Sequence, residues 1–302
     1  MALEFTVSKN LNMKNSLFIL LIFVCFIACL STRKKQKPTI AFDSKVLTGS
    51  LFTGGIEGPC TDKNNDLYLV NFHHEGSIGL IKNKDSLPQL FVNLPNGSIG
   101  NGIRFNNKNE MFVADYMNHN ILKINISTKN ISVYTHDTLM NQPNDLTMMK
   151  NGIIFCSDPN WKNGNGKLWR IDTNGKTHLL ADSMGTTNGI EVNPTNNILY
   201  VNESVQKIIW KFNIDSAGNI SNKTTLISFT DGGMDGMRCH SNGTLYLARY
   251  DKSCILAISP DGKIIKEYKL HGQKPTNIAF SRDEKKLFVT MQDKKWVEVI
   301  EF

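Results

Sequence analysis

The sequence lacks the short motifs that mark several large enzyme classes. It contains no Gly-x-Ser-x-Gly nucleophile elbow, no His-Glu-x-x-His zinc motif, no phosphate-binding P-loop and no Gly-x-Gly-x-x-Gly fingerprint after an apolar run. Ser98, in the stretch Gly97–Ser98–Ile99–Gly100, has the wrong spacing for a nucleophile elbow and is expected in a turn. Any chemistry must therefore come from residues that are dispersed along the chain and brought together by the fold.

Proline and charge are also sparse. Nine prolines in 302 residues and 20% charged residues indicate a globular chain rather than a disordered one. The net charge of +7 is mild, and the lysines are scattered without a basic stripe of interleaved aromatic residues, which argues against a nucleic-acid partner. Apolar residues with a helical period are missing outside an N-terminal run, so the sequence predicts a chain of strands.

Six cysteines occur, but no Cys-x-x-Cys pair, which argues against a zinc knuckle or a thioredoxin-like motif. Two of them lie in the N-terminal run. The other four permit three disulfide pairings, and the sequence does not choose among them. These four are Cys60, Cys156, Cys239 and Cys254. We expect buried free thiols that pack as small hydrophobic residues.

The one long apolar run, Leu17–Ala28, follows Lys14 and precedes Cys29. A positive residue, an apolar segment of this length and a small residue at its end are typical of a secretory signal peptide. The stretch Phe26–Cys29 resembles a bacterial lipobox, although Phe26 stands where leucine is usual. We therefore predict that residues 1–29 are a lipoprotein signal, that Cys29 is acylated, and that the protein is exported and lipid-anchored to a bacterial membrane.

The alternative for this run is an uncleaved membrane anchor. Arg33–Lys37 carries four positive charges just beyond the run, and positive charge favours the cytoplasmic side. The run is short for a spanning helix, which favours export. Residues 30–43 are predicted to be a polar tether that ends in a short strand.

The rest of the chain repeats one plan at near-constant spacing. A polar or acidic residue stands at the head of a short apolar run six times, and the steps between these residues are 44, 43, 44, 47 and 42. The six residues are Glu57, Asn101, Asn144, Asn188, Asp235 and Asn277. A period of about 40–45 residues with several strands in each unit is typical of a β-propeller.

Each unit contains four short apolar runs separated by Asn, Gly and Asp. In the second unit they are 101–105, 111–114, 121–124 and 131–134. Such runs predict short antiparallel strands joined by tight turns. We therefore predict that residues 44–302 form an all-β, six-bladed propeller with four-stranded blades. The last unit is one strand short, so an N-terminal strand near 39–42 or 45–48 is expected to close the ring.

The repeated polar residue is expected at the start of the innermost strand, beside the axis. In an up-and-down blade, the loop between the second and third strands returns to the same end of the axis. These loops are therefore predicted to surround a mouth above the six repeated residues. The candidate substrate-binding residues in them are His73, Tyr116, His119, Trp161, Glu203, Arg249 and Tyr250.

Four of the repeated residues form an oxygen-rich set that suits a hard cation: Glu57, Asn144, Asn188 and Asp235. Calcium accepts roughly six to eight oxygen ligands, including Asn carbonyl oxygens, and four protein oxygens would leave positions for water or substrate. Asn101 and Asn277 are equally well explained by turn geometry. Glu has no such preference, so Glu57 is the least easily explained by local structure.

Around these residues, the motifs Glu57–Gly58–Pro59, Pro143–Asn144–Asp145, Asn188–Gly189–Ile190 and Asp235–Gly236–Met237 resemble, in order and spacing, the gluconolactonase/regucalcin (senescence marker protein) family. The resemblance covers roughly residues 50–302. It implies a catalytic divalent cation, usually calcium, and hydrolysis of sugar lactones. It further implies that Glu57, Asn188 and Asp235 bind the metal and that Asn144 lies beside it and orients substrate or water.

The resemblance also gives Asp235 the role of general base. A carboxylate bound to a divalent cation has a lowered pKa and is a weak base, so a water activated by the metal is the alternative source of the nucleophile. His73 and His119 are similar to histidines near the metal in related lactonases and phosphotriesterases. The sequence does not fix their orientation.

Two other functions remain open at this point. Propellers that hydrolyse organophosphates resemble the same Glu/Asn/Asn/Asp ring. The stretch Ala114–Ile121 resembles NHL-type repeats, which act as non-catalytic binding platforms. A binding platform has no need of carboxylates at both Glu57 and Asp235. We therefore expect a monomeric, calcium-dependent lactonase whose partner is a small sugar lactone.

Overall fold

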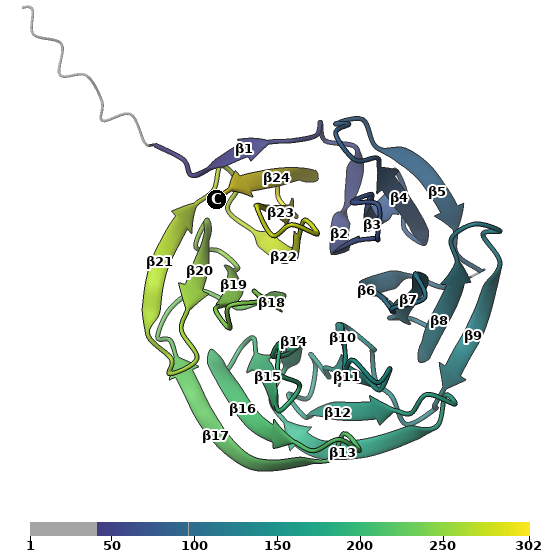
Figure 1. Ribbon diagram of the computed structural model, residues 1–302, viewed down its shortest axis with the longest axis vertical. Helices are drawn as coiled ribbons and strands as arrows, with labels where there is room; N and C mark the ends of the chain where they lie inside the picture. Colours follow the sequence, from purple (N-terminus) through teal and green to yellow (C-terminus); the bar gives the residue numbers. More distant parts are fainter. Residues whose placement is uncertain (1–40, 96) are drawn as a thin grey trace, which may run out of the picture. The chain divides into compact units, whose positions relative to one another are not determined.

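Six four-stranded antiparallel sheets are arranged as blades around a central axis (Figure 1). This computed structural model describes residues 41–95 and 97–302, and no helix occurs in those residues. The predicted all-β, six-bladed propeller is thereby confirmed. The predicted lipoprotein signal, including Cys29, lies outside the described residues and stays a prediction. Within the described part, no helix is long and apolar enough to cross a membrane.

The strands follow one another from the axis outward in each of the first five blades. The first blade consists of β2 (Phe52–Thr61), β3 (Leu67–Phe72), β4 (Ser77–Ile81) and β5 (Gln89–Asn93). The second consists of β6 (Gly100–Phe105), β7 (Glu110–Asp115), β8 (Asn120–Asn125) and β9 (Ile131–His136). The third consists of β10 (Leu146–Met148), β11 (Ile154–Asp158), β12 (Gly166–Ile171) and β13 (Thr177–Met184).

The remaining blades keep this order. The fourth consists of β14 (Thr187–Val192), β15 (Ile198–Glu203), β16 (Ile208–Ile214) and β17 (Ile220–Ser228). The fifth consists of β18 (Met237–Cys239), β19 (Leu245–Arg249), β20 (Cys254–Ile258) and β21 (Ile264–Lys269). The sixth contains β22 (Pro275–Phe280), β23 (Lys286–Met291) and β24 (Trp296–Glu301), and its fourth strand is β1 (Ser44–Val46).

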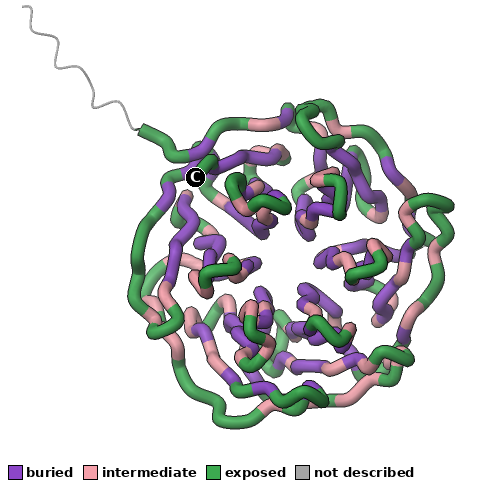
Figure 2. Tube along the Cα trace, in the orientation of Figure 1, coloured by how far each residue is buried: buried purple, intermediate pink, exposed green. Residues whose placement is uncertain are grey.

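Burial falls from the axis to the rim. The middle strands β3, β4, β19 and β20 are buried throughout, whereas the outer strand β21 is exposed at five of its six residues. Figure 2 shows the same gradient around the ring. Each of the six interfaces between neighbouring blades has its own apolar cluster. A blade therefore buries its two faces against its two neighbours, which is why the ring must close.

The ring is closed by pairing between the two ends of the chain. β1 pairs antiparallel with β24, with Ser44 opposite Ile300 and Val46 opposite Glu298. Closure thus uses the later of the two expected N-terminal segments. The earlier one, 39–42, is not a strand at its described residues 41 and 42. The four cysteines in the described part are free thiols, as expected; Cys156 and Cys254 are buried, whereas Cys60 and Cys239 are only partly buried.

A buried carboxylate fastens this closure. Glu298 has no exposed surface and accepts hydrogen bonds from Ser44 Oγ at 2.5 Å, from the backbone N–H groups of His271 and Gly272 at 3.0 and 2.9 Å, and from Trp296 Nε1 at 3.1 Å. Four donors converge on one acceptor, so the side chain joins β1 to two neighbouring segments.

Replacing this acceptor should weaken closure. Glu298→Gln puts an amide NH2 among four donors and leaves at least one buried donor unpaired, at a cost of about 2–3 kcal/mol of unfolding free energy. Urea unfolding measures this loss. Glu301→Gln is the matched control because its ion pair with Lys45 is exposed and should cost less than about 0.5 kcal/mol. Equal losses for the two variants would contradict the assignment.

Candidate active site

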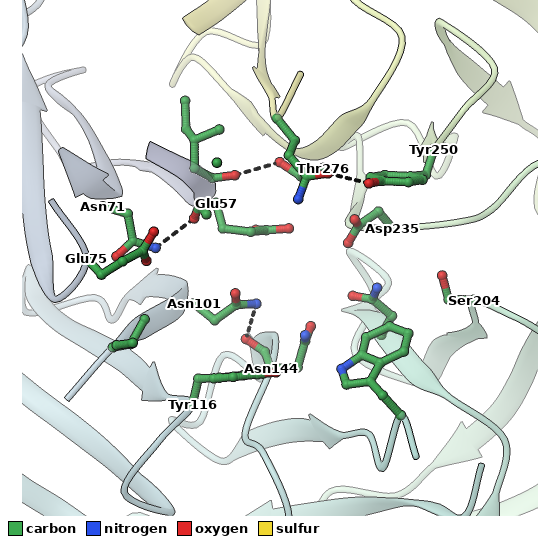
Figure 3. A pocket seen from close by; sticks show the side chains of 17 residues that line it. Glu57, Asn71, Glu75, Asn101, Tyr116, Asn144, Ser204, Asp235, Tyr250 and Thr276 are labelled. Atoms are coloured by element: carbon green, nitrogen blue, oxygen red, sulfur yellow. Dashed lines mark hydrogen bonds between the residues drawn. The ribbon is translucent and has the colours of Figure 1, made fainter. Parts of the chain in front are cut away.

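A cavity of about 490 Å³ lies at one end of the propeller axis (Figure 3). Its lining includes Glu57, Asn144, Asn188 and Asp235, so the structure brings these four dispersed side chains together. The other lining residues are Gly54, Gly55, Ile56, Asn71, Glu75, Ile99, Asn101, Tyr116, Trp161, Ser204, Tyr250, Thr276 and Gln292. Inner strands supply the floor, and the loops between second and third strands supply most of the wall.

The inner strands hold the four residues in slightly different ways. Glu57 lies inside β2 and Asn188 is the second residue of β14, whereas Asn144 and Asp235 each precede a short strand by two residues. The backbone at these two positions is nonetheless paired: Asn144 N–H donates to Ser157 O at 2.9 Å and Asp235 N–H to Ala248 O at 3.0 Å. Each side chain is therefore presented by backbone that is hydrogen-bonded within its own blade.

Two neighbouring carboxylates, Glu57 and Asp235, lie at the cavity floor. Burial, and then the charge of Asp145, raise the pKa of Glu57 to about 7. Burial, and then the neighbouring Glu57 carboxylate, raise the pKa of Asp235 well above its usual value, although Asn188 hydrogen-bonds it and opposes the shift. Two neighbouring buried acids with raised pKa values form a place where added positive charge would be stabilised.

The amide beside these acids is also incompletely satisfied. Asn144 Oδ1 is buried and has no hydrogen-bond partner among the described residues. A buried carbonyl oxygen without a partner, next to two repelling carboxylates, is a donor set that fits a hard divalent cation. The described residues contain no group of three or more His, Cys, Asp or Glu side chains that could hold a metal, so amide oxygens must complete any such site.

Asn101 and Asn277 lie within strands β6 and β22, so turn geometry does not explain them. Asn277 Nδ2 donates to Glu57 Oε2 at 2.9 Å, and Gly58 N–H donates to the same oxygen at 2.6 Å. Asn101 Nδ2 donates to Asn144 O at 3.1 Å. Both asparagines therefore position a neighbour that lines the cavity.

The glycines that follow several of these residues are required by packing between blades. A Cβ on Gly58, which has a φ of +57°, would lie 1.9 Å from Asn101 O. A Cβ on Gly236 would lie 2.0 Å from the Asn277 side chain. Neighbouring inner strands approach each other closely at these two positions, and Gly permits it.

Below the carboxylates, an ion cluster links three blades. Asp145 is fully buried, and its two oxygens lie 3.2 Å from Arg104 Nη1 and 3.2 Å from Arg238 Nη1. Burial alone would raise the pKa of Asp145, but the two guanidinium groups outweigh burial and hold that pKa below its usual value. Arg104 also lies 3.6 Å from Glu191. No motif in the sequence predicts this cluster.

The candidate substrate-binding residues divide into two groups. Tyr116, Trp161 and Tyr250 line the axial cavity, and His119 lines a neighbouring cavity that shares Tyr116 and Trp161. The other three, His73, Glu203 and Arg249, line neither cavity.

These three have other contacts. His73 is exposed and packs edge-on against Phe72. Glu203 is buried and accepts a hydrogen bond from Gly185 N–H at 3.0 Å. Arg249 is buried, binds Asp231 at 3.0 Å and stacks over Phe229. The side chains of Glu203 and Arg249 therefore stabilise loop backbone and loop residues through these contacts.

Besides Asn101, five polar side chains of the cavity lining were not among the candidates. They are Asn71, Glu75, Ser204, Thr276 and Gln292. The position of the strand ends supplies a signal that would have found two of them, Ser204 and Gln292. Glu203 and Arg249 end strands β15 and β19 and point into the protein, whereas the next residues, Ser204 and Tyr250, line the cavity. Tyr116 and Gln292 follow β7 and β23 in the same way.

This fold and site define a six-bladed propeller with acidic and amide side chains gathered at one end of its axis. The family model described as SMP-30/Gluconolactonase/LRE-like region matches residues 56–293, and the chain belongs to this family. The resemblance expected from the four motifs is thus confirmed.

Individual relatives agree with this assignment. The chain is 26% identical over 216 residues to a gluconolactonase of Zymomonas mobilis, a match that covers 63% of this chain and 60% of that protein. It is 26% identical over 269 residues to diisopropyl-fluorophosphatase of Loligo vulgaris, covering 78% and 85%. The matches to three lactonases span only 60%, 46% and 52% of those proteins.

A solved structure shares the fold. Regucalcin from Agrobacterium tumefaciens, described as a calcium-binding protein, superimposes with a TM-score of 0.76 at 19% identity, covering 86% of this chain and 93% of the other. At this identity the likeness concerns the fold alone.

Proposed function

We propose that this protein is a lactonase that hydrolyses the ring ester of a sugar lactone with the help of a divalent cation, calcium being the ion that suits its oxygen donors best. One observation carries the proposal: two buried carboxylates, both with a raised pKa, stand beside an unpartnered amide oxygen in a cavity of about 490 Å³. Similarity to a gluconolactonase and a pentonolactonase supports the substrate class.

The residues that would hold the cation are Glu57, Asn144, Asn188 and Asp235. When bound, such an ion supplies Lewis-acid polarisation of the lactone carbonyl. Asn277 and Gly58 N–H fix the Glu57 carboxylate and keep it aimed at the cavity. Both hydrogen bonds go to Oε2, so the other carboxylate oxygen, Oε1, would be available to a cation.

The chemical step then falls to Asp235 and its neighbours. Asp235 accepts the proton of the water that adds to the lactone carbonyl and returns a proton to the ring oxygen as the C–O bond breaks. The Asn144 amide orients the reacting group. Tyr116, Trp161 and Tyr250 stand in the wall, where they can stack on and hydrogen-bond to a polyol.

A panel of aldonolactones tests this proposal, with the full-length protein assayed in millimolar calcium and in excess chelator. In calcium we expect hydrolysis faster than the spontaneous rate. Excess chelator should abolish this difference. The absence of lactone hydrolysis in both conditions would overturn it.

A second candidate is hydrolysis of a phosphofluoridate or phosphotriester at the same residues. The observation that favours it is the match to diisopropyl-fluorophosphatase over 85% of that protein. Diisopropyl fluorophosphate therefore belongs in the same panel. Fluoride release that exceeds lactone hydrolysis in kcat/KM would make this the primary activity.

Calcium should stabilise the protein in a pH-dependent way. Glu57 has a folded-state pKa of about 7 against an ordinary value of 4.5. The metal-free folded state therefore holds a proton that the unfolded state releases, and its stability falls as pH rises from about 4.5 to 7, by up to about 3 kcal/mol. A cation binds the ionised acids, so its effect should grow over the same range.

Calorimetry at pH 5 and pH 8 measures this difference. At a calcium concentration near 100 times Kd we expect Tm to rise by about 5–8 °C at pH 8 and by much less at pH 5. Glu57→Gln is the control, because it removes both the titrating acid and a cation ligand. An equal calcium effect at the two pH values would contradict the prediction.

A further inference from the structure

A second cavity of about 530 Å³ adjoins the axial one. Tyr116 and Trp161 line both cavities, so the two spaces share a wall. Each volume is in the range that accommodates a small ligand. A molecule seated at the carboxylates could therefore extend past Tyr116 and Trp161 into the second space.

The chemistry of the second cavity is that of a neutral polar site. Three amide side chains, Asn141, Gln142 and Asn160, line it together with the two aromatic residues. None of its eight described lining residues carries a carboxylate, and Lys162 is the single lysine or arginine among them. Aromatic faces and neutral amides match the two kinds of surface that a pyranose ring presents, its C–H face and its hydroxyl edge.

Two polar atoms of this wall are unsatisfied. Asn141 Nδ2 and His119 Nδ1 are buried and have no hydrogen-bond partner among the described residues. An apolar substituent would cover the Asn141 amide without offering it an acceptor, which costs free energy. A hydroxyl group can accept from the amide and donate to the imidazole nitrogen after a small adjustment.

The wall is also held in place before any ligand arrives. The buried Asp158 carboxylate accepts from Asn141 N–H at 2.8 Å, from Gln142 N–H at 2.6 Å and from Trp169 Nε1 at 2.8 Å. Asp158 thereby fixes the backbone of the 141–142 segment. Trp161, on the opposite loop, is 41% exposed, which is unusual for a tryptophan without a ligand to cover it.

We propose that the second cavity is a sugar-binding subsite and that the substrate is an aldonolactone carrying a glycosyl group, with the lactone ring at Glu57 and Asp235 and the second pyranose ring between Trp161 and Asn141. This inference rests on the proposed lactonase function. It replaces a single-ring lactone by a two-ring lactone as the preferred substrate.

The test compares glucono-1,5-lactone with cellobiono-1,5-lactone in calcium, using the full-length protein and subtracting spontaneous hydrolysis. We expect kcat/KM at least about ten-fold higher for the two-ring lactone. The side chains of Asn141 and Gln142 make no hydrogen bonds in the described structure. Asn141→Ala and Gln142→Ala should each lower the ratio of the two kcat/KM values several-fold, and the double variant should lower it about ten-fold. Leu139→Ala, at an exposed neighbour outside the cavity, should leave the ratio unchanged.

Binding of the open products gives a readout that does not require turnover. Calorimetry should show cellobionate binding about ten-fold more tightly than gluconate. Asn141→Ala should reduce this difference several-fold, and Asn141→Ala combined with Gln142→Ala should abolish it. Equal kcat/KM and equal affinity for the one-ring and two-ring compounds would overturn the subsite while leaving the lactonase proposal intact. A preference for 6-phosphogluconolactone that Lys162→Ala removes would overturn it in favour of an anionic substituent. If no lactone is hydrolysed but cellobionate still binds more tightly, the subsite stands and the proposed reaction fails.

Discussion

Replacing Asp235 by alanine should lower kcat for lactone hydrolysis by about 10²–10⁴, the largest effect we expect on activity. Asp235 combines two roles in the proposed reaction, because it both faces the cation position with Glu57 and accepts the proton of the attacking water. Loss of its carboxylate removes the base and leaves Glu57 as the remaining acid at that position. The loss is measured from initial rates, with and without calcium, on an aldonolactone that the unmodified protein hydrolyses.

The matched control is Asp251→Asn. Asp251 follows the cavity residue Tyr250 in the loop between β19 and β20 of the same blade as Asp235, but its side chain is 58% exposed and does not line the axial cavity. We expect kcat within about two-fold of the unmodified protein, as for most exposed substitutions. Similar losses for Asp235→Ala and Asp251→Asn would show that the effect does not depend on a carboxylate inside the cavity.

Asp235→Asn separates the two roles of this residue. An asparagine keeps a carbonyl oxygen for a cation but cannot accept a proton. If the variant loses turnover and keeps most of the calcium-induced rise in Tm, the proton-accepting role is established. If turnover persists while the calcium effect is reduced, Asp235 acts mainly as a ligand and another group receives the proton.

The fold could be predicted because each blade of a propeller corresponds to one repeat of the sequence pattern. Residues 44 or 43 apart, such as Glu57, Asn101 and Asn144, occupy equivalent places in successive blades, so a spacing converts directly into a position around the axis. The closing strand was harder to place. Ser44–Val46 is only three residues long, and its pairing depends on the buried Glu298 at the other end of the chain.

The wall of the site could be predicted only in part. The loops were correctly located between second and third strands, but Glu203 and Arg249 point inward while Ser204 and Tyr250 line the cavity. Side chains alternate along a strand, so an error of one residue in the strand end reverses the direction assigned to a side chain. Short apolar runs do not fix their ends to one residue.

The ion cluster at Asp145 could not be predicted for a different reason. Its partners Arg104 and Arg238 come from the second and fifth blades. Each arginine lies three residues after the repeated polar residue of its blade. Neither arginine belongs to a motif. Their meeting at one carboxylate depends on the diameter of the ring at the depth of β6 and β18, which the sequence period does not specify.

Asp145→Asn should therefore destabilise the whole ring. The substitution leaves two guanidinium groups buried without a full counter-charge, and breaking a buried ion pair in this way costs about 3–5 kcal/mol. Urea unfolding, followed by tryptophan fluorescence, measures the loss. Asp172→Asn is the matched control, because its pair with Arg170 at 3.1 Å has a 31% exposed carboxylate side chain and should cost less than about 1 kcal/mol.

The same substitution also tests how the ring supports the site. Asn277 Nδ2 lies 2.9 Å from Glu57 Oε2 and 3.4 Å from Asp145 Oδ2, so one amide joins the ion cluster to the candidate cation ligand. Weakening the cluster should reduce the calcium-induced rise in Tm as well as the stability of the metal-free protein. A stable Asp145→Asn variant with an unchanged calcium effect would show that the arginines are satisfied by other groups and that the hub of the propeller does not depend on this carboxylate.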